Sequence, residues 1–314
     1  MPSSSRSRQL LGINYMWQVL KSSAPPMIHL MPRISVSLVS YKDSIDELED
    51  LFMSLHGNEL VSVWVVVDNA AHEYPSLGEK LRMRVEQFGG RYIATPGNIG
   101  FGAAHNLALR SIKDVSSEFH LMVNPDILFD HTVLPALVRV LDARPQVGWV
   151  MPKVLYPDGS QQYLCKLLPT PLDFVVRRFL PVRLQTLLKG YMDRYELRGL
   201  ENSESTSIPF LSGCFVMTRR GMLQAVGGFD ERYFLYMEDV DLCRRMAIHC
   251  ELLYWPHISV THGFRRGSHR SLKLMLTHLR SSILYFNRWG WIFDRERSRV
   301  NRAALTQLSF VQSR

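Results

Sequence analysis

Cysteine is scarce in this chain, with 4 residues among 314, at Cys165, Cys214, Cys243 and Cys250 and without a CxxC pair. Such a distribution favours buried thiols in a reducing compartment over a disulfide framework or a zinc site. The sequence also lacks an apolar run of the roughly 18 residues that a membrane-spanning helix needs. Its N-terminus shows no sustained apolar segment before a small-residue cleavage site, as a secretory signal would. We therefore expect a cytoplasmic protein.

Acidic residues are in the minority: the formal net charge is +8 and the isoelectric point about 9.4, which predicts an anionic partner. The excess is concentrated from Arg265 to Arg302, a stretch with ten lysines and arginines and only two acids, Asp294 and Glu296. The basic residues there are mixed with Leu, Tyr and Trp. This mixture suits an anionic membrane at least as well as nucleic acid, and a solvated basic helix is an equally good interpretation. We expect no nucleic-acid partner, because no RNA- or DNA-binding motif is present.

What the chain does contain is a regular alternation of two kinds of segment. The β-rich or apolar stretches 34–41, 60–68, 91–95 and 119–126 are separated by helix-like stretches. This order predicts an α/β fold with a parallel, doubly wound sheet. Ligands of such sheets bind beyond the carboxyl ends of the strands.

The remaining segments are less regular. Residues 1–33 are polar and basic and predict a flexible leader. Segment 165–207 is apolar, basic and cut by prolines, which is compatible with a lid, a membrane-facing helical insert or a plain pair of surface helices. Residues 251–262 predict a pair of strands, and 265–314 a basic, aromatic helical tail.

Polar side chains stand where three of the expected strands end: Ser40 with Tyr41, Asp68, and Asn124 with Asp126. Because these ends meet at one edge of a parallel sheet, the coincidence predicts a binding site. Asp126 could hold a divalent cation that in turn binds a phosphate, although an isolated Asn-Pro-Asp equally closes a turn. Asp68 could accept a hydrogen bond from a base or a ribose hydroxyl, or close a turn as well.

Two further motifs follow. In GNIGFGAAHN, residues 97–106, the glycines permit close backbone approach to a phosphate or sugar at a helix start, although the pattern is not GxGxxG. His262 follows a strand and could bind a metal or a phosphate, or be structural.

The stretch richest in acidic and aromatic residues is YFLYMEDVDLCRR, residues 233–245. Aromatic rings beside Glu238 and Asp239 are typical of a pocket wall that carries a general base, because a desolvated carboxylate is more basic. The alternative is a helix start, since acids are favoured in a first helical turn.

The order of these motifs is more specific than any one of them. With the series VVDNA (66–70), GNIGFGAAHN (97–106), NPD (124–126), LSGCFVMTRR (211–220), GGFDERYFLYMEDVDLCRR (227–245) and His262, the chain resembles the inverting glycosyltransferases of family 2. The resemblance covers about residues 34–290. It is strongest to rhamnosyltransferases of O-antigen and cell-wall polysaccharide assembly, which share the NIGFG turn, NPD in place of DxD, and FxYxEDxDLCxR.

The resemblance implies the Rossmann-like GT-A fold, a mixed sheet with flanking helices. The catalytic domain would span 34–264, with a nucleotide-sugar-binding half, 34–130, and an acceptor half, 131–264. The tail, 265–314, would follow it.

The resemblance also implies roles for individual residues. Asp239 would be the base and Glu238 would orient the acceptor, while Asp126 and His262 would hold Mg²⁺ or Mn²⁺ on the donor diphosphate. Donor-binding residues would be Ser40, Tyr41, Asp68, Asn98, Gly100, Asn106, Asn124 and Asp126. Asn124 stands where DxD enzymes have an aspartate, which leaves one carboxylate for the cation.

The implied reaction is transfer of a sugar, expected to be L-rhamnose from dTDP-L-rhamnose, to a lipid-linked saccharide or a growing polysaccharide. It would take place at the inner face of the cell membrane, with peripheral contact to anionic lipid. One alternative keeps the fold but uses a UDP-hexose or UDP-N-acetylhexosamine. Another is a non-catalytic nucleotide-sugar or glycan-binding protein, which the presence of Asp68, Asp126 and Asp239 disfavours.

Overall fold

The computed structural model describes residues 33–179, 188–200, 204–263 and 272–312. The expected leader therefore lies outside the described residues except for Arg33, and so do Arg265, Arg266 and Arg270 of the tail. Residues 32–314 form one compact unit. Within the described ranges, no helix combines the length and the apolar character needed to cross a membrane.

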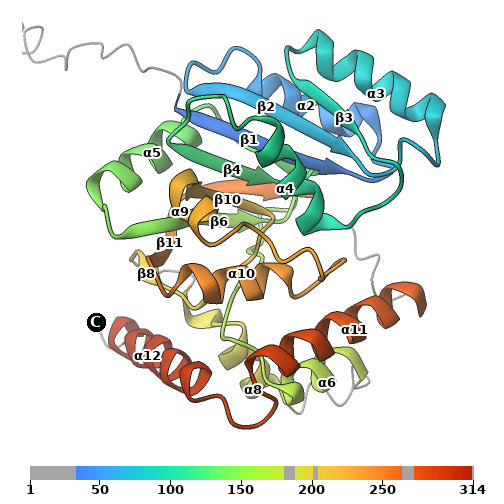
Figure 1. Ribbon diagram of the computed structural model, residues 1–314. Coiled ribbons are helices and arrows are strands. Elements are labelled where there is room, and N and C mark those ends of the chain that lie inside the picture. Colours follow the sequence, from blue (N-terminus) through green and yellow to red (C-terminus); the bar gives the residue numbers. More distant parts are fainter. Residues whose placement is uncertain (1–32, 180–187, 201–203, 264–271, 313–314) are drawn as a thin grey trace, which may run out of the picture. The chain divides into compact units, whose positions relative to one another are not determined.

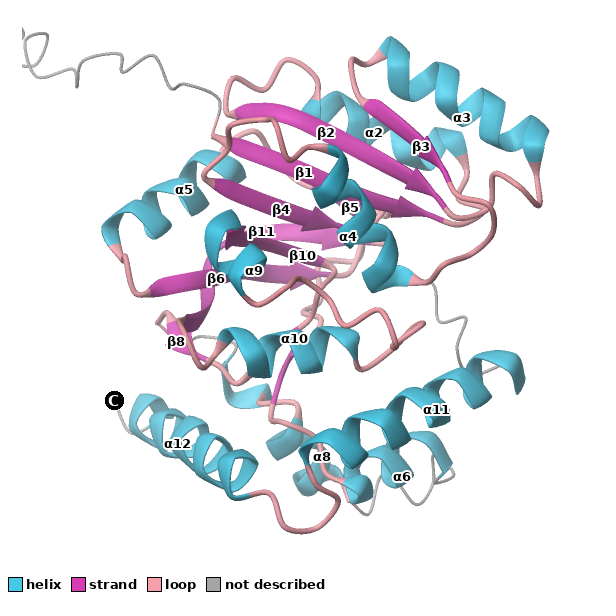
Figure 2. Cartoon of the chain, in the orientation of Figure 1, coloured by secondary structure: helices cyan, strands magenta, loops and turns pink. Residues whose placement is uncertain are grey.

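The first half forms the predicted parallel sheet (Figures 1 and 2). Its strands lie in the order β3-β2-β1-β4 and are all parallel. The elements are β1 Ile34–Ser40, α2 Ile45–Leu55, β2 Val61–Asp68, α3 Pro75–Gln87, β3 Arg91–Ala94, α4 Phe101–Ser111 and β4 Phe119–Val123. Strands β1 and β4 are buried along their whole length, as expected for central strands covered on both faces.

The second half makes the sheet mixed, which confirms the mixed GT-A sheet, while the parallel sheet predicted from the alternation in residues 34–126 is confirmed for β1 to β4. Strand β10 is antiparallel to β4 and to β6, whereas β11 is parallel to β6. Short strands β5 and β8 pair with β11. The bounds are β5 Ile127–Leu128, β6 Val147–Leu155, β8 Thr206–Ser207, β10 Phe215–Arg219 and β11 Glu251–His262.

The prediction of two strands over 251–262 is wrong, because β11 is a single strand of 12 residues. The sequence was misleading at Pro256, which cannot donate a hydrogen bond to a neighbouring strand. The strand accommodates this proline with a shift of register against β6 between Trp255 and Ser259.

Helices cover both faces of the sheet (Figure 1). Buried side chains of α2, α3 and α5 (Val133–Ala143) share one apolar cluster with β1 and β4. On the other face, Ala104 and Ala108 of α4 pack on Val65 and Val67 of β2. Helices α9 (Arg220–Ala225) and α10 (Glu238–Met246) contribute to a separate cluster with Trp149 of β6.

Segment 165–207 and the tail lie against each other. The segment contains β7 Cys165–Lys166, which pairs with β9 Phe210–Leu211, then α6 Pro171–Phe179, α8 Lys189–Tyr195 and the 3-10 turn Arg198–Leu200. The tail consists of α11 Leu272–Trp289 and α12 Arg295–Gln312. The Phe174 ring of α6 lies 4.9 Å from the His278 ring of α11, and Asn301 of α12 bonds both backbone groups of Leu168.

Candidate active site

The ends of β1 and β2 lie side by side, as predicted. Ser40 and Asp68 are register partners, and the Asn69 N–H donates to the Ser40 carbonyl over 2.9 Å. The Ser40 hydroxyl is turned to Asp43, whose Oδ2 it reaches over 3.0 Å. Tyr41 is exposed, and its hydroxyl donates to Glu73.

Asp68 is buried at this edge and is held by two donors. Its Oδ1 accepts from the Ala70 N–H over 2.8 Å and its Oδ2 from the Tyr92 hydroxyl over 2.9 Å. Burial and the Asp68 carboxylate raise the pKa of Tyr92. Tyr92 was not predicted from the sequence, because only the pairing of β2 with β3 brings it to Asp68.

The glycine-rich turn is tied to the acidic stretch. Gly100 adopts φ +92°, and a Cβ at this position would collide with the Phe234 carbonyl oxygen. That same oxygen accepts a 3.0 Å hydrogen bond from the Phe101 N–H at the start of α4. The Asn98 Oδ1 accepts from the Gly100 N–H over 2.9 Å and so closes the turn. Gly100 is therefore required for approach to the protein's own backbone.

The Asn106 side chain forms its hydrogen bonds within the protein. Its amide donates to the Phe229 carbonyl over 2.8 Å and accepts from the Phe229 N–H over 2.9 Å. It also donates to Glu231 over 3.0 Å. The buried amide thus holds the Gly-Gly-Phe-Asp turn, a role that differs from the direct donor contact expected from the sequence.

Asp126 and His262 come together as predicted. The pairing of Ile127 with His262 between β5 and β11 places His262 Nε2 3.2 Å from Asp126 Oδ1. Asn124 contributes its amide nitrogen 3.5 Å from the same Nε2. The side chain of Asp126 stays partly exposed, which leaves it accessible to a ligand.

Gln162 orients His262 and was missed in the sequence, where it lies 100 residues away. Its amide nitrogen donates to the His262 carbonyl over 2.8 Å, so its Oε1 faces His262 Nδ1 at 2.9 Å. Nδ1 of a neutral imidazole then carries the proton, and Nε2 presents its lone pair to Asp126. Nε2 of His262 and Oδ1 of Asp126, 3.2 Å apart, are thus two potential ligands for one cation.

The acidic pair stands in the first turn of α10, which begins at Glu238. Tyr236 and Met237, directly before it, both adopt φ 68°. For residues other than glycine this conformation costs about 1–3 kcal/mol each and is common at functional sites. The strain places the two carboxyls at the beginning of the helix.

The two carboxyls differ in environment. Glu238 is buried, and its Oε2 has no hydrogen-bond partner among the described residues. Burial first, and then the charge of Asp239, hold the pKa of Glu238 well above its usual range. Asp239 is only partly buried, and accepts from the Val240 N–H at 2.9 Å and the Gly213 N–H at 3.4 Å. Burial raises the pKa of Asp239, while these N–H groups and Lys166 oppose the shift.

One dipeptide connects the acidic pair to Asp126 and His262. Gly213 donates to Asp239, and the carbonyl of the next residue, Cys214, accepts from the Asn124 N–H over 2.8 Å. Burial, with the nearby carboxylates of Asp126 and Asp239, raises the pKa of the Cys214 thiol to about 12. The Gly213-Cys214 dipeptide thus links Asp239 to the strand end that leads to Asp126.

The far side of α10 is clamped by the tail. Asp241 is fully buried and accepts from Arg245 at 2.8 Å and from the Trp289 indole at 2.9 Å, and Arg288 lies 3.1 Å away. Arg244 forms two hydrogen bonds with Asp294, of 2.6 and 3.0 Å, in a buried position. The helix that carries Asp239 is thus fixed by α11 and by the residue before α12.

The fold and this site together define a GT-A glycosyltransferase. Among solved structures, the chain is similar to the mannosyltransferase PcManGT of Pyrobaculum calidifontis in complex with GDP-Man and Mn²⁺. The identity is 17%, the TM-score is 0.50, and the match covers 95% of this chain and 82% of the other. It is also similar to S. aureus TarS in complex with UDP-GlcNAc, with 16% identity, a TM-score of 0.50, and coverage of 90% and 74%.

The sequence comparison defines the family. The model of the family described as "Glycosyltransferase like family 2" matches residues 32–280, and the chain belongs to this family of enzymes. It is 30% identical to N-acetylglucosaminyl-diphospho-decaprenol L-rhamnosyltransferase of Mycobacterium tuberculosis over 217 residues, 64% of this chain and 68% of the relative. It is 25% identical to rhamnosyltransferase WbbL of Escherichia coli over 233 residues, 70% and 83% of the two chains.

Proposed function

We propose that this glycosyltransferase is an inverting rhamnosyltransferase, which transfers L-rhamnose from dTDP-L-rhamnose to a lipid-linked saccharide or a growing polysaccharide. The observation that carries the proposal is the Gly213-Cys214 link, which ties the partly exposed Asp239 to Asn124, two residues before the Asp126 that lies against His262. The choice of rhamnose is supported by the two rhamnosyltransferases among the relatives.

The residues present fit a divalent cation. Asp126 offers a partly exposed carboxylate and His262 an oriented imidazole lone pair, an oxygen and nitrogen pair that suits Mn²⁺ better than Mg²⁺, which takes oxygen ligands. When bound, the cation supplies charge that stabilises the leaving diphosphate. The mannosyltransferase structure named above contains Mn²⁺.

Asp239 is proposed as the general base. Its raised pKa makes it a stronger base than an ordinary aspartate, and its partial exposure leaves it open to an acceptor. It removes the proton from an acceptor hydroxyl, whose oxygen attacks the anomeric carbon from the side opposite the dTDP leaving group. The bond to the diphosphate oxygen breaks with its electron pair, and the anomeric configuration inverts. Glu238, whose pKa burial raises, is proposed to orient the acceptor.

Donor binding is assigned to the strand ends. Asp68 would recognise the nucleotide base and Ser40 and Tyr41 would line the same end, while Asn98 and Gly100 shape the turn beside the sugar nucleotide. Asn106 would support this site indirectly through the 228–231 turn. Asn124 would lie at the diphosphate next to Asp126.

A lipid-linked acceptor would place the enzyme at the inner face of the cell membrane, in peripheral contact with anionic lipid. The support is the net charge of +8 and the name of the mycobacterial relative, which specifies a diphospho-decaprenol acceptor. No nucleic-acid partner is proposed.

Calorimetry with dTDP, UDP and GDP, with and without Mn²⁺, tests the donor site. Tight dTDP binding that needs Mn²⁺ and is lost in Asp126→Asn is the expected result. A preference for UDP would replace rhamnose by a hexose or N-acetylhexosamine. Asp239→Asn should abolish turnover and leave donor binding intact, whereas a wild type that binds donor but transfers no sugar to any lipid-linked acceptor would contradict the proposal.

A further inference from the structure

Helix α11 exposes an apolar stripe next to its buried side. The buried side carries Ser281, Ser282, Tyr285 and Phe286. The helix exposes Leu272, Leu276, Leu279 and Ile283, at 67%, 55%, 37% and 41% of their surface. These four residues follow the spacing i, i+4, i+7 and i+11 and so form one stripe. A surface helix is normally apolar on its inner face alone, so the outer stripe calls for an occupant.

The turn after α11 extends this stripe. Trp291, Ile292 and Phe293 are 44%, 79% and 94% exposed. The Trp291 indole N–H donates to the Asn287 side chain over 2.8 Å, one turn beyond Ile283. We call Leu272, Leu276, Leu279, Ile283, Trp291, Ile292 and Phe293 the apolar ridge.

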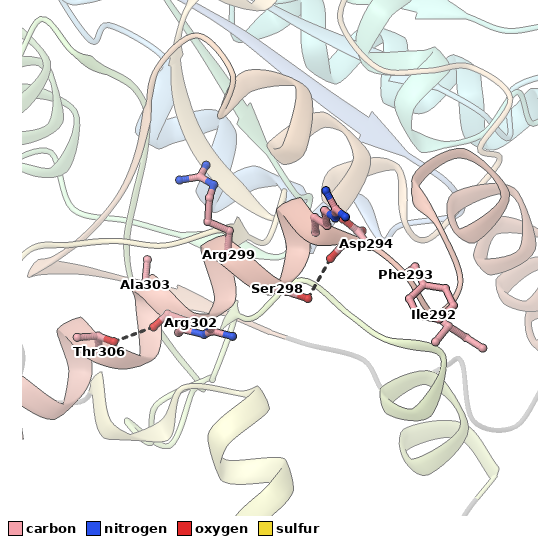
Figure 3. Close-up of a pocket in the computed structure, with 9 residues that line it drawn as sticks. Ile292, Phe293, Asp294, Ser298, Arg299, Arg302, Ala303 and Thr306 are labelled. Atoms are coloured by element: carbon pink, nitrogen blue, oxygen red, sulfur yellow. Dashed lines mark hydrogen bonds between the residues drawn. The ribbon is translucent and has the colours of Figure 1, made fainter.

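Positive charge borders the ridge. Lys273 and Arg280 are exposed on α11, each one residue beyond a ridge leucine, and residues 272–289 contain no acid. Beyond the turn, Ile292 and Phe293 share an open hollow of about 890 Å³ with three arginines of α12, shown in Figure 3. These are Arg295, Arg299, which also pairs with Glu296 at 2.6 Å, and Arg302.

We propose that the apolar ridge is a membrane-docking surface for an anionic bilayer. The ridge side chains enter the boundary between head groups and acyl chains, while Lys273, Arg280 and the α12 arginines contact lipid phosphates. A second copy of the chain is a poorer occupant, because a two-fold contact between two ridges would bring their bordering cations together.

This docking would place the lipid near the proposed base. The inner side of α11 contacts the strained segment before Glu238: Ser281 Oγ donates to the Leu235 carbonyl over 2.8 Å, and the His278 ring lies 4.6 Å from the Tyr236 ring. The same helix would thus touch the membrane and position the acidic pair. The inference that docking brings the acceptor to the acidic pair rests on the proposed lipid-linked acceptor. Docking itself can be measured without sugar transfer.

Vesicle co-sedimentation tests the docking. The full chain should bind vesicles of equal parts phosphatidylcholine and phosphatidylglycerol, and bind phosphatidylcholine alone weakly. The double variant Leu276→Glu/Ile283→Glu should lose about tenfold or more in affinity because it places charge in the apolar boundary. Lys273→Ala and Arg280→Ala should each lose about fivefold on anionic vesicles. Met83→Glu, an equally drastic change at an exposed methionine of α3, should bind as the wild type does.

Two results would overturn the proposal. One is wild-type vesicle affinity in Leu276→Glu/Ile283→Glu. The other comes from analytical ultracentrifugation: the wild type is a dimer, and the variant is a monomer that still binds vesicles as the wild type does. The ridge would then be a contact between two copies of the chain. Urea unfolding of the same preparations shows that the variants are folded. Absence of dTDP binding in the wild type would count against the proposed function and leave the vesicle result valid.

Discussion

The carbonyl oxygen of Phe234 accepts a 3.0 Å hydrogen bond from the backbone N–H of Phe101 and lies against the Cα of Gly100. This contact joins the glycine-rich turn at the donor side to the segment that leads into Glu238 and Asp239. The two motifs are more than 130 positions apart in the sequence, yet each limits the position of the other.

Replacing Gly100 should therefore disturb both sides of the site. We expect Gly100→Ala to lower the free energy of unfolding by about 1–3 kcal/mol, because the new Cβ meets the Phe234 carbonyl and φ is positive. Urea unfolding and dTDP calorimetry measure the two effects. Gly97→Ala is the matched control in the same turn, since a Cβ there meets no atom within 4 Å and φ is not positive. Equal stability of the two variants would contradict the argument.

Removing the base should affect turnover rather than donor binding. Asp239→Asn is expected to lower kcat by about 10²–10⁴. In the wild type, kcat should fall as pH falls through the raised pKa of Asp239, because the base is then protonated. Initial rates against pH should place the acidic limb above the ordinary aspartate pKa of about 3.9. A limb at the ordinary value would remove Asp239 from this role.

Glu238 should make the free energy of unfolding fall as pH rises, which is the opposite of the usual effect of a carboxyl group. A carboxyl whose pKa is raised on folding binds more protons in the folded than in the unfolded state, so it lowers stability as pH rises above the unfolded value of about 4.3. Glu238→Gln cannot ionise and removes this loss. Urea unfolding at pH 5 and pH 8 should show the variant gaining stability relative to the wild type at the higher pH. The opposite trend would mean that Glu238 is stabilised as a carboxylate.

Gln162 should matter for the cation without touching it. Gln162→Leu leaves the His262 imidazole without its orienting partner, and we expect Mn²⁺ affinity, measured by calorimetry in the presence of dTDP, to fall about tenfold or more. Gln161→Leu is the control, because the Gln161 amide bonds the Tyr254 hydroxyl instead. Similar Mn²⁺ affinities in the two variants would show that His262 needs no such support.

The sequence predicted the elements of the first half well because strand and helix alternate there with strong apolar periodicity. It also located Asp126 and His262, since both follow strands and a sheet brings strand ends together. It could not show Gln162 or Tyr92, which reach the site only through strand pairing across long separations. Asn106 lies in the glycine-rich motif, but its amide bonds the Phe229 backbone, a contact that the sequence does not show.

The contacts between α10 and the tail limit where this chain can be truncated. The family match ends at residue 280, but Arg288, Trp289 and Asp294, which partner Asp241 and Arg244, lie beyond it. A chain truncated at 264 or 280 would retain Arg244 without Asp294, and breaking such a buried pair typically costs about 3–5 kcal/mol. Asp241 would keep Arg245 but lose its contacts with Trp289 and Arg288. Exchange of the tail between relatives therefore requires that the incoming segment supply a carboxylate opposite Arg244.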